Sequence, residues 1–224
     1  METIGLSLRA QRSNLVNNLT RWIASSLALL AMTMLFSFSS IYANSAVQTI
    51  QSTYQSISDL QADFVQSTHV AILGKTVKER GIFSMKKPGQ LRIEYKGEHP
   101  RQYISDGKKL WIVDPELEQV ETYKISANTV PKEALELLKG FADMEKLFII
   151  NGWKPKRRLQ NHSYLRLVPK NAKAQYNWLD CEFGPDNILK TMVIHNKSEN
   201  VSTYIFSSVK LNTGLSDDLF SFKN

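Results

Sequence analysis

Apolar and polar residues alternate between residues 80 and 124, and this pattern predicts a series of short β-strands. Because side chains two residues apart point to the same face of a strand, each apolar segment gives its strand one apolar face. An Asp-Gly pair between two such segments is typical of a tight hairpin, since the turn requires positive φ. The turns are Lys87-Pro88-Gly89, Lys96-Gly97-Glu98, Asp106-Gly107 and Asp114-Pro115. The stretch therefore predicts an antiparallel meander with one broad apolar face.

The rest of the chain predicts three short helices and further strands. Apolar residues recur at helical spacing in residues 47–58, 131–140 and 141–148. The strands expected outside the meander are Leu60–Thr68, Thr76–Met85, Trp153–Leu159, Ser163–Pro169, Trp178–Phe183, Ile188–His195 and Val201–Leu211. The sequence therefore predicts an α+β fold with an antiparallel sheet of about ten to eleven strands, one face of which must be covered.

Two interpretations of the covered face follow from this pattern. Three short apolar-striped helices can cover one opening of a strongly curved sheet, but they are too few to fill a barrel-sized interior. The first interpretation is therefore a hollow apolar space under a helical lid. The second is an ordinary α+β core in which all side chains interlock. The residue pattern alone does not choose between them.

The N-terminal segment has the parts of a secretory signal peptide. Three arginines precede an apolar run at residues 22–38, and small residues follow it. The alternative is an uncleaved membrane anchor, which requires roughly 20 apolar residues, whereas this run is shorter and contains serine and threonine. We therefore expect cleavage between Ala43 and Ala46 and export to the periplasm. Residues 1–45 are then the signal peptide, and residues 46–224 form a single domain.

Charge and titratable residues argue against nucleic-acid binding and catalysis. The formal net charge is +7, but the aromatic residues form no RNA-binding motif. The four histidines lack metal-ligand spacing, and G-x-S-x-G, H-E-x-x-H and a phosphate-binding glycine loop are absent. Cys181 is the single cysteine and is expected to fill the core as a small apolar residue. The sequence thus predicts no enzyme, no cofactor, no metal site and no nucleic-acid partner.

The ordered motifs of the meander resemble one known family. They run G-x-F-x-M-K-K-P-G-x-L-R-I-E-Y, then I-S-D-G-K-K-L-W-I-V-D-P, then E-Q-V. This order resembles the periplasmic outer-membrane lipoprotein carrier family, LolA, and a weaker likeness extends from Val47 to Phe222. The resemblance implies a strongly curved open or half barrel whose helices act as a lid over lipid acyl chains. It therefore favours the hollow interpretation.

The resemblance also implies which residues meet the lipid. The apolar face of the meander is expected to line a hydrophobic cavity, with two leucines facing it from the lid. The alternative for each residue is ordinary core packing. The expected lipid-binding residues are Phe83, Met85, Leu91, Ile93, Tyr95, Tyr103 and Trp111, with Leu135 and Leu138 in the lid.

Lys87, the basic residue directly before Pro88, carries the most specific expectation for a single residue. Lys87 shares a strand face with Phe83 and Met85. In the resembling family a basic residue at this place, typically arginine, hydrogen-bonds the lid backbone and keeps the empty carrier closed. Lysine forms fewer fixed bonds than arginine, so either Lys87 or Arg92 is expected to be the latch. The alternative is that Lys87 only extends its charge into solvent at a strand end.

The function implied by the resemblance is transport without catalysis. The protein is expected to be a monomeric carrier that shields the acyl chains of triacylated lipoproteins and moves them from the inner to the outer membrane. The expected partners are an ABC-type lipoprotein-releasing transporter of the inner membrane and an outer-membrane receptor or the membrane itself. The alternative is a regulatory module on the same fold that senses envelope lipid or lipoproteins. Such modules usually carry an additional domain, for which this chain leaves no room.

Overall fold

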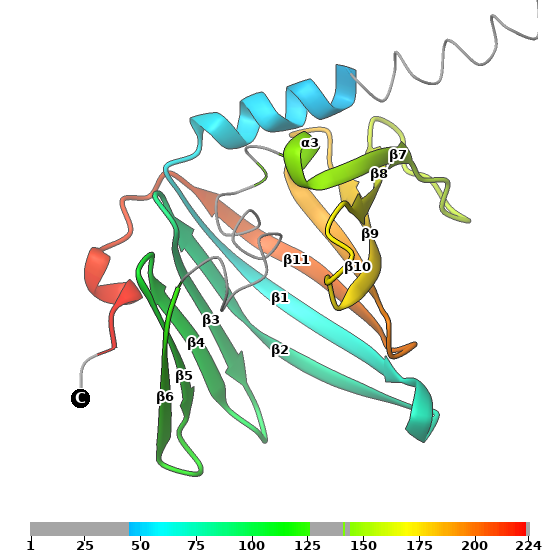
Figure 1. Cartoon of the computed structure of the whole chain (residues 1–224). Helices are drawn as coiled ribbons and strands as arrows, with labels where there is room; N and C mark the ends of the chain where they lie inside the picture. The colour runs from blue at the N-terminus through cyan, green and yellow to red at the C-terminus, as the bar shows by residue number, and fades with distance from the viewer. Residues whose placement is uncertain (1–44, 126–140, 142–143, 223–224) are drawn as a thin grey trace, which may run out of the picture. The chain divides into compact units, whose positions relative to one another are not determined.

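One large antiparallel sheet dominates the protein. The computed structural model describes residues 45–125, 141 and 144–222. Within them, eleven strands are ordered β6-β5-β4-β3-β2-β1-β11-β10-β9-β8-β7 (Figure 1). The strands are β1 (Asp59–Val70), β2 (Lys75–Lys86), β3 (Gln90–Lys96), β4 (Arg101–Asp106), β5 (Lys109–Asp114), β6 (Gln119–Lys124), β7 (Phe148–Gly152), β8 (Ser163–Pro169), β9 (Tyr176–Phe183), β10 (Leu189–Asn196) and β11 (Val201–Leu211). The expected antiparallel sheet of about ten to eleven strands is confirmed.

The helices differ from the sequence-based expectation of three. The described residues contain two α-helices, the first at residues 45–56 and α3 at Met144–Leu147, together with two short 3-10 helices. The 3-10 helices are η1 (Ala71–Leu73) and η2 (Asp217–Phe220). The helix expected at residues 131–140 lies outside the described residues.

The strand expected from Trp153 to Leu159 is wrong. The strand lies earlier, at Phe148–Gly152, and pairs with β8 from Phe148↔Pro169 to Gly152↔Leu165. Pro155 has no backbone N–H to donate to a neighbouring strand, which disfavours a strand around it. Pairing with β8 places Phe148 in the core, where it is 2 % exposed. Of the helix expected at residues 141–148, the described α3 therefore covers Met144–Leu147, and Phe148 begins β7 instead.

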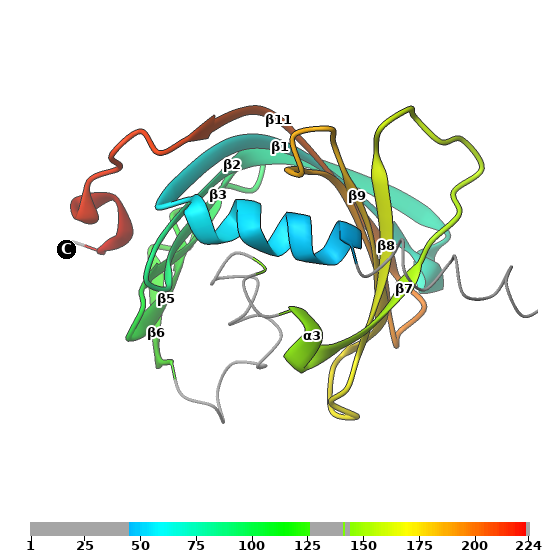
Figure 2. The same cartoon turned by 90° about the horizontal axis from the view of Figure 1, so that it is seen from above.

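The first and last strands of the chain pair at the centre of the curved sheet. β1 pairs with β2 on one side and β11 on the other, so the two halves of the chain continue one sheet. The sheet wraps around the first helix, which lies along its concave side (Figure 2). The β1–β11 register shifts between Gln61 and Asp63, and Ser208 opposite this place has φ of 52°. Such a bulge bends the strand and increases its twist.

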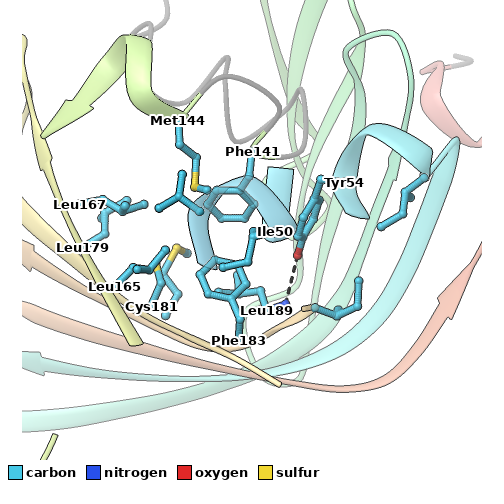
Figure 3. Packing of buried hydrophobic residues seen from close by; sticks show 14 of the residues in the cluster. Ile50, Tyr54, Phe141, Met144, Leu165, Leu167, Leu179, Cys181, Phe183 and Leu189 are labelled. Atoms are coloured by element: carbon cyan, nitrogen blue, oxygen red, sulfur yellow. Dashed lines mark hydrogen bonds between the residues drawn. The ribbon is translucent and has the colours of Figure 1, made fainter. Parts of the chain in front are cut away.

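The first helix packs through one apolar stripe. Val47, Ile50 and Tyr54 are spaced three and four residues apart, and each is at most 3 % exposed. They contact a buried cluster that β8, β9 and β10 supply, together with Phe141 and Met144 (Figure 3). This packing fixes the helix over one half of the concave face.

Asp59 fastens the C-terminal segment to the start of β1. Its buried carboxylate accepts hydrogen bonds from the backbone N–H groups of Thr213 at 2.8 Å and Gly214 at 3.0 Å. Burial by itself raises the pKa of Asp59, but these bonds outweigh burial and lower the pKa below its usual value. The ionised carboxylate therefore stabilises the fold.

Replacing Asp59 with alanine is expected to lower the free energy of unfolding by about 2 kcal/mol at neutral pH, because charge-assisted bonds are lost. Since the folded-state pKa is depressed, this contribution is present above the unfolded pKa and is lost as the pH falls through the lower folded value, below about 4. Urea unfolding at several pH values measures it. Asp63→Ala, on an exposed site of the same strand, is the control. Equal stability losses in the two variants would contradict the anchor.

Candidate functional site

An apolar cavity of about 330 Å³ opens on the concave face of the sheet. The first helix, the β1–β5 half of the sheet and strands β10 and β11 all contribute to its wall. The lining residues are Tyr54, Leu60, Ala62, Phe64, Phe83, Met85, Leu91, Ile93, Tyr95, Tyr103, Leu110, Ile125, Phe141, Ile188, Leu189, Met192, Ile194, Tyr204, Phe206 and Val209. None of these side chains carries a formal charge at neutral pH.

Strand alternation and register bring these side chains to one face. Ala62 of β1 pairs with Phe83 of β2, and Phe83 pairs with Ile93 of β3, so all three point to the concave side. Ala62 is small, which allows the rings of Phe83 and Phe206 to approach across it with centroids 6.0 Å apart. A small residue between larger ones thus shapes the floor of the cavity.

Only one half of the concave face is packed solid. The buried cluster beneath the first helix fills the space over β8, β9 and β10. Over β2–β5 the apolar side chains face the cavity instead. An engineered cavity of about 150 Å³ lined by Leu, Ile and Phe stays dry and binds benzene. A space about twice as large with a similar lining is therefore suited to an apolar ligand.

Tyr54 lies at the boundary between the packed half and the hollow half. Its ring meets Phe141 and Phe183 edge-on, at centroid distances of 5.2 and 6.5 Å. Its hydroxyl oxygen accepts a hydrogen bond from the backbone N–H of Leu189 at 3.1 Å (Figure 3). Burial raises the pKa of Tyr54, so the phenol stays neutral. Tyr54 thereby holds the first helix at a fixed height above β10.

Tyrosines give the other end of the cavity a neutral polar edge. The Tyr95 hydroxyl donates to Oε1 of Gln66 at 2.7 Å, and burial raises the pKa of both Tyr95 and Tyr204. The Arg101 guanidinium stacks on the Tyr95 ring, 3.8 Å from its centroid, and pairs with Glu79 at 2.5 Å. The positive charge of Arg101 at this edge is therefore neutralised by Glu79.

The structure places six of the nine expected lipid-binding residues on the cavity wall: Phe83, Met85, Leu91, Ile93, Tyr95 and Tyr103. The expectation for Trp111 is corrected. Trp111 pairs with Ile104 and so lies on the other face, whereas Leu110, which pairs with Ser105, lines the cavity. Leu135 and Leu138 lie outside the described residues.

Lys87 reaches the first helix, and Arg92 does not. The Lys87 ammonium donates to the carbonyl oxygens of Tyr54 at 2.5 Å and Gln55 at 3.1 Å. A cation at this place also complements the negative end of the helix dipole. Arg92 is on the opposite face, where its guanidinium donates to the carbonyl of Leu219 at 3.2 Å. Of the two expected latch residues, only Lys87 contacts the first helix, whereas Arg92 contacts the 3-10 helix η2.

Sequence reasoning missed the wall contributed by β1, β10 and β11. Phe64, Met192 and Phe206 all line the cavity. In β11 the alternation of apolar residues was a usable signal, since Tyr204 and Phe206 are two residues apart and both line the cavity. The bulge at Ser208 then transfers the inward direction from Phe206 to Val209, three residues later.

Cys181, the single cysteine, is buried and does not line this cavity. Burial raises the pKa of the Cys181 thiol, which is fully enclosed in the core. No cluster of three or more His, Cys, Asp or Glu side chains suited to a metal ion occurs in the part of the chain that the structure describes. None of the helices there has the length and hydropathy needed to cross a bilayer.

Residues 55–223 match the family described as outer membrane lipoprotein carrier protein LolA. The chain belongs to the LolA family. The family expected from the meander motifs is thereby confirmed. Relatives named outer-membrane lipoprotein carrier protein include one from Francisella philomiragia, 29% identical over 87% of this chain and 91% of that protein. Another, from Methylobacillus flagellatus, is 25% identical over 79% and 83%.

A crystal structure of a LolA superfamily protein from Nitrosomonas europaea is also similar. It covers 80% of this chain and 97% of that one, with 13% identity and a TM-score of 0.46. Family membership itself rests on the sequence match over residues 55–223.

Proposed function

We propose that the protein is a periplasmic carrier that shields the acyl chains of lipoproteins and moves them from the inner to the outer membrane. The apolar cavity between the first helix and the β1–β5 half of the sheet carries this proposal. Its described wall has no formally charged side chain and no reactive group. Membership of the LolA family and the printed names of the relatives support the same cargo class.

The physical need for such a carrier follows from hydrophobic transfer. Each methylene buried from water contributes about 0.8 kcal/mol, so an acyl chain of roughly 16 carbons is held in a membrane by about 12 kcal/mol. A triacylated lipoprotein therefore requires a comparable apolar site to cross an aqueous compartment. The cavity offers part of that site and grows if the first helix moves away from the sheet.

In this proposal, residues 1–45 direct export and are removed, and residues 46–224 act as a monomer. Lys87 closes the first helix over the empty cavity, and Leu135 and Leu138 face the cargo from the lid. An ABC-type transporter of the inner membrane loads the carrier and supplies the energy. An outer-membrane receptor, or the membrane itself, takes the cargo. No step requires catalysis or a cofactor.

A release assay tests the proposal. The full chain is expressed in a Gram-negative host, purified from its soluble extract, and added to spheroplasts of that host. The expected result is the appearance of lipoproteins in the supernatant in complex with the protein. Ile93→Trp, which places a larger ring in the cavity, is expected to release little. Release that is equal for the two proteins, or absent for both, would contradict the proposal.

A further inference from the structure

The β1–β2 hairpin ends in two aliphatic side chains that project into solvent. η1 forms its tip, where Ile72 is 92 % exposed and Leu73 is 65 % exposed. These are the most exposed large hydrophobic residues in the part of the chain that the structure describes. Figure 1 shows this tip at the lower right, at the far end of the long β1 and β2 strands from the first helix. Core packing does not explain them.

The tip is held rigidly. The β1–β2 ladder is unbroken from Asp59↔Lys86 to Val70↔Lys75, directly before the tip. Within the tip, the Gly74 N–H donates to the Ala71 carbonyl at 3.2 Å, and Gly74 has φ of 58°. The Ala71 N–H donates to Oδ1 of Asn200 in the β10–β11 turn at 2.9 Å. A binding element presented in this way loses little conformational entropy when it binds.

The charges next to the tip in the β1–β2 sequence are positive, and the adjacent β10–β11 turn adds one exposed charge of each sign, Lys197 and Glu199. Residues 70–78 contain Lys75 and Lys78, both exposed, and no acidic residue. The β5–β6 turn makes the opposite arrangement, because its exposed Leu117 lies between Glu116 and Glu118. Both turns expose aliphatic side chains, two at the β1–β2 tip and Leu117 at the β5–β6 turn, and they differ in charge. The β1–β2 tip therefore complements an anionic surface, and the β5–β6 turn does not.

We propose that the Ile72–Leu73 tip inserts into the surface of a bilayer that contains anionic phospholipid. A specific protein partner needs about 800 Å² of complementary surface on each side, whereas this tip is a narrow point without a groove. A bilayer requires no shape complementarity and accepts isolated aliphatic side chains between its headgroups, while nearby lysines attract anionic lipid. The tip would hold a carrier at the membrane where it collects or delivers cargo. Vesicle binding itself requires no cargo, so this inference stands apart from the cavity.

Vesicle sedimentation with the full chain tests the inference. Vesicles of phosphatidylcholine alone are compared with vesicles that also contain phosphatidylglycerol. Replacing both Ile72 and Leu73 with serine is expected to weaken binding about a hundredfold, at about tenfold for each of the two inserted side chains. Lys75→Gln with Lys78→Gln is expected to weaken binding to the anionic vesicles only, by about fivefold for each lysine. Leu117→Ser is the matched control and is expected to bind as the wild type.

A fluorescence measurement reports the insertion directly. Leu73→Trp is expected to shift its emission to shorter wavelength when anionic vesicles are added, whereas Leu117→Trp is not. Unchanged circular dichroism and fatty-acid binding of the serine variant show that the fold and cavity are intact. Wild-type vesicle binding by that variant would overturn the inference, as would an unshifted emission. A dimer of the wild-type chain that the serine variant abolishes, without vesicle binding, would assign the tip to self-association and also overturn it.

Discussion

Leu91→Glu is expected to reduce binding of a fluorescent fatty acid at least a hundredfold. Leu91 lines the cavity from β3 and is 7 % exposed. The carboxyl group introduced at position 91 would have no charged partner on this apolar wall. It would either ionise and bring water into the cavity, or remain protonated with a raised pKa. Both outcomes remove the apolar surface that an acyl chain requires. Fluorescence titration with the purified full chain measures the change.

The control places the same charge on the other face of the sheet. Val65 of β1 is 48 % exposed, so Val65→Glu is expected to leave fatty-acid binding within about twofold of the wild type. Near-ultraviolet circular dichroism verifies that Leu91→Glu is folded. Ile93→Trp supplies a second test without a charge, because its ring occupies cavity volume. Wild-type binding by both cavity variants would remove the cavity as the binding site.

Lys87→Met is expected to increase the apparent affinity for a fatty acid by roughly tenfold or more. The variant keeps an apolar side chain of similar length but loses the bonds from the ammonium to the Tyr54 and Gln55 carbonyls. Hydrogen bonds from a charged group are worth about 1.5–3 kcal/mol, and these bonds exist only while the helix is closed. Their loss shifts the population toward the open, ligand-accepting state. Fluorescence titration and stopped-flow association rates measure it.

Lys87→Arg is the matched control for the latch. Arginine retains the charge and offers more fixed donors to the same carbonyl groups, so the variant is expected to bind the fatty acid no more tightly than the wild type. Urea unfolding separates the latch from general damage, since Lys87→Met should destabilise the empty protein while binding improves. Weaker binding together with lower stability would indicate a purely structural lysine.

The meander half of the cavity was readable from the sequence because its signals are local. The Asp106-Gly107 turn and the alternation of Leu91, Ile93 and Tyr95 specify neighbouring antiparallel strands, and adjacent strands share a face. The misplacement of Trp111 shows the limit of this reasoning. Neighbouring residues of a strand point to opposite faces, so an error of one residue places a side chain on the wrong face. The pairing of β5 with β4 places Leu110, and not Trp111, on the concave face.

The other half of the wall depends on contacts between distant parts of the chain. β1 pairs with β11, so that Asp63 lies opposite Ser207, and no local pattern specifies that pairing. The bulge at Ser208 then changes which residues of β11 point inward. The hollow itself also depends on where packing stops, and the first helix packs over one half of the sheet only. Periodicity identifies an apolar face but does not show whether side chains fill the space before it.

Crystals grown with a terminally brominated fatty acid would test the central claim most directly. Bromine scatters anomalously, so its position can be located independently of the protein atoms. The account predicts a bromine peak inside the cavity, near the rings of Phe83 and Phe206. A peak on the convex face of the sheet, with the concave cavity closed by protein side chains, would contradict it.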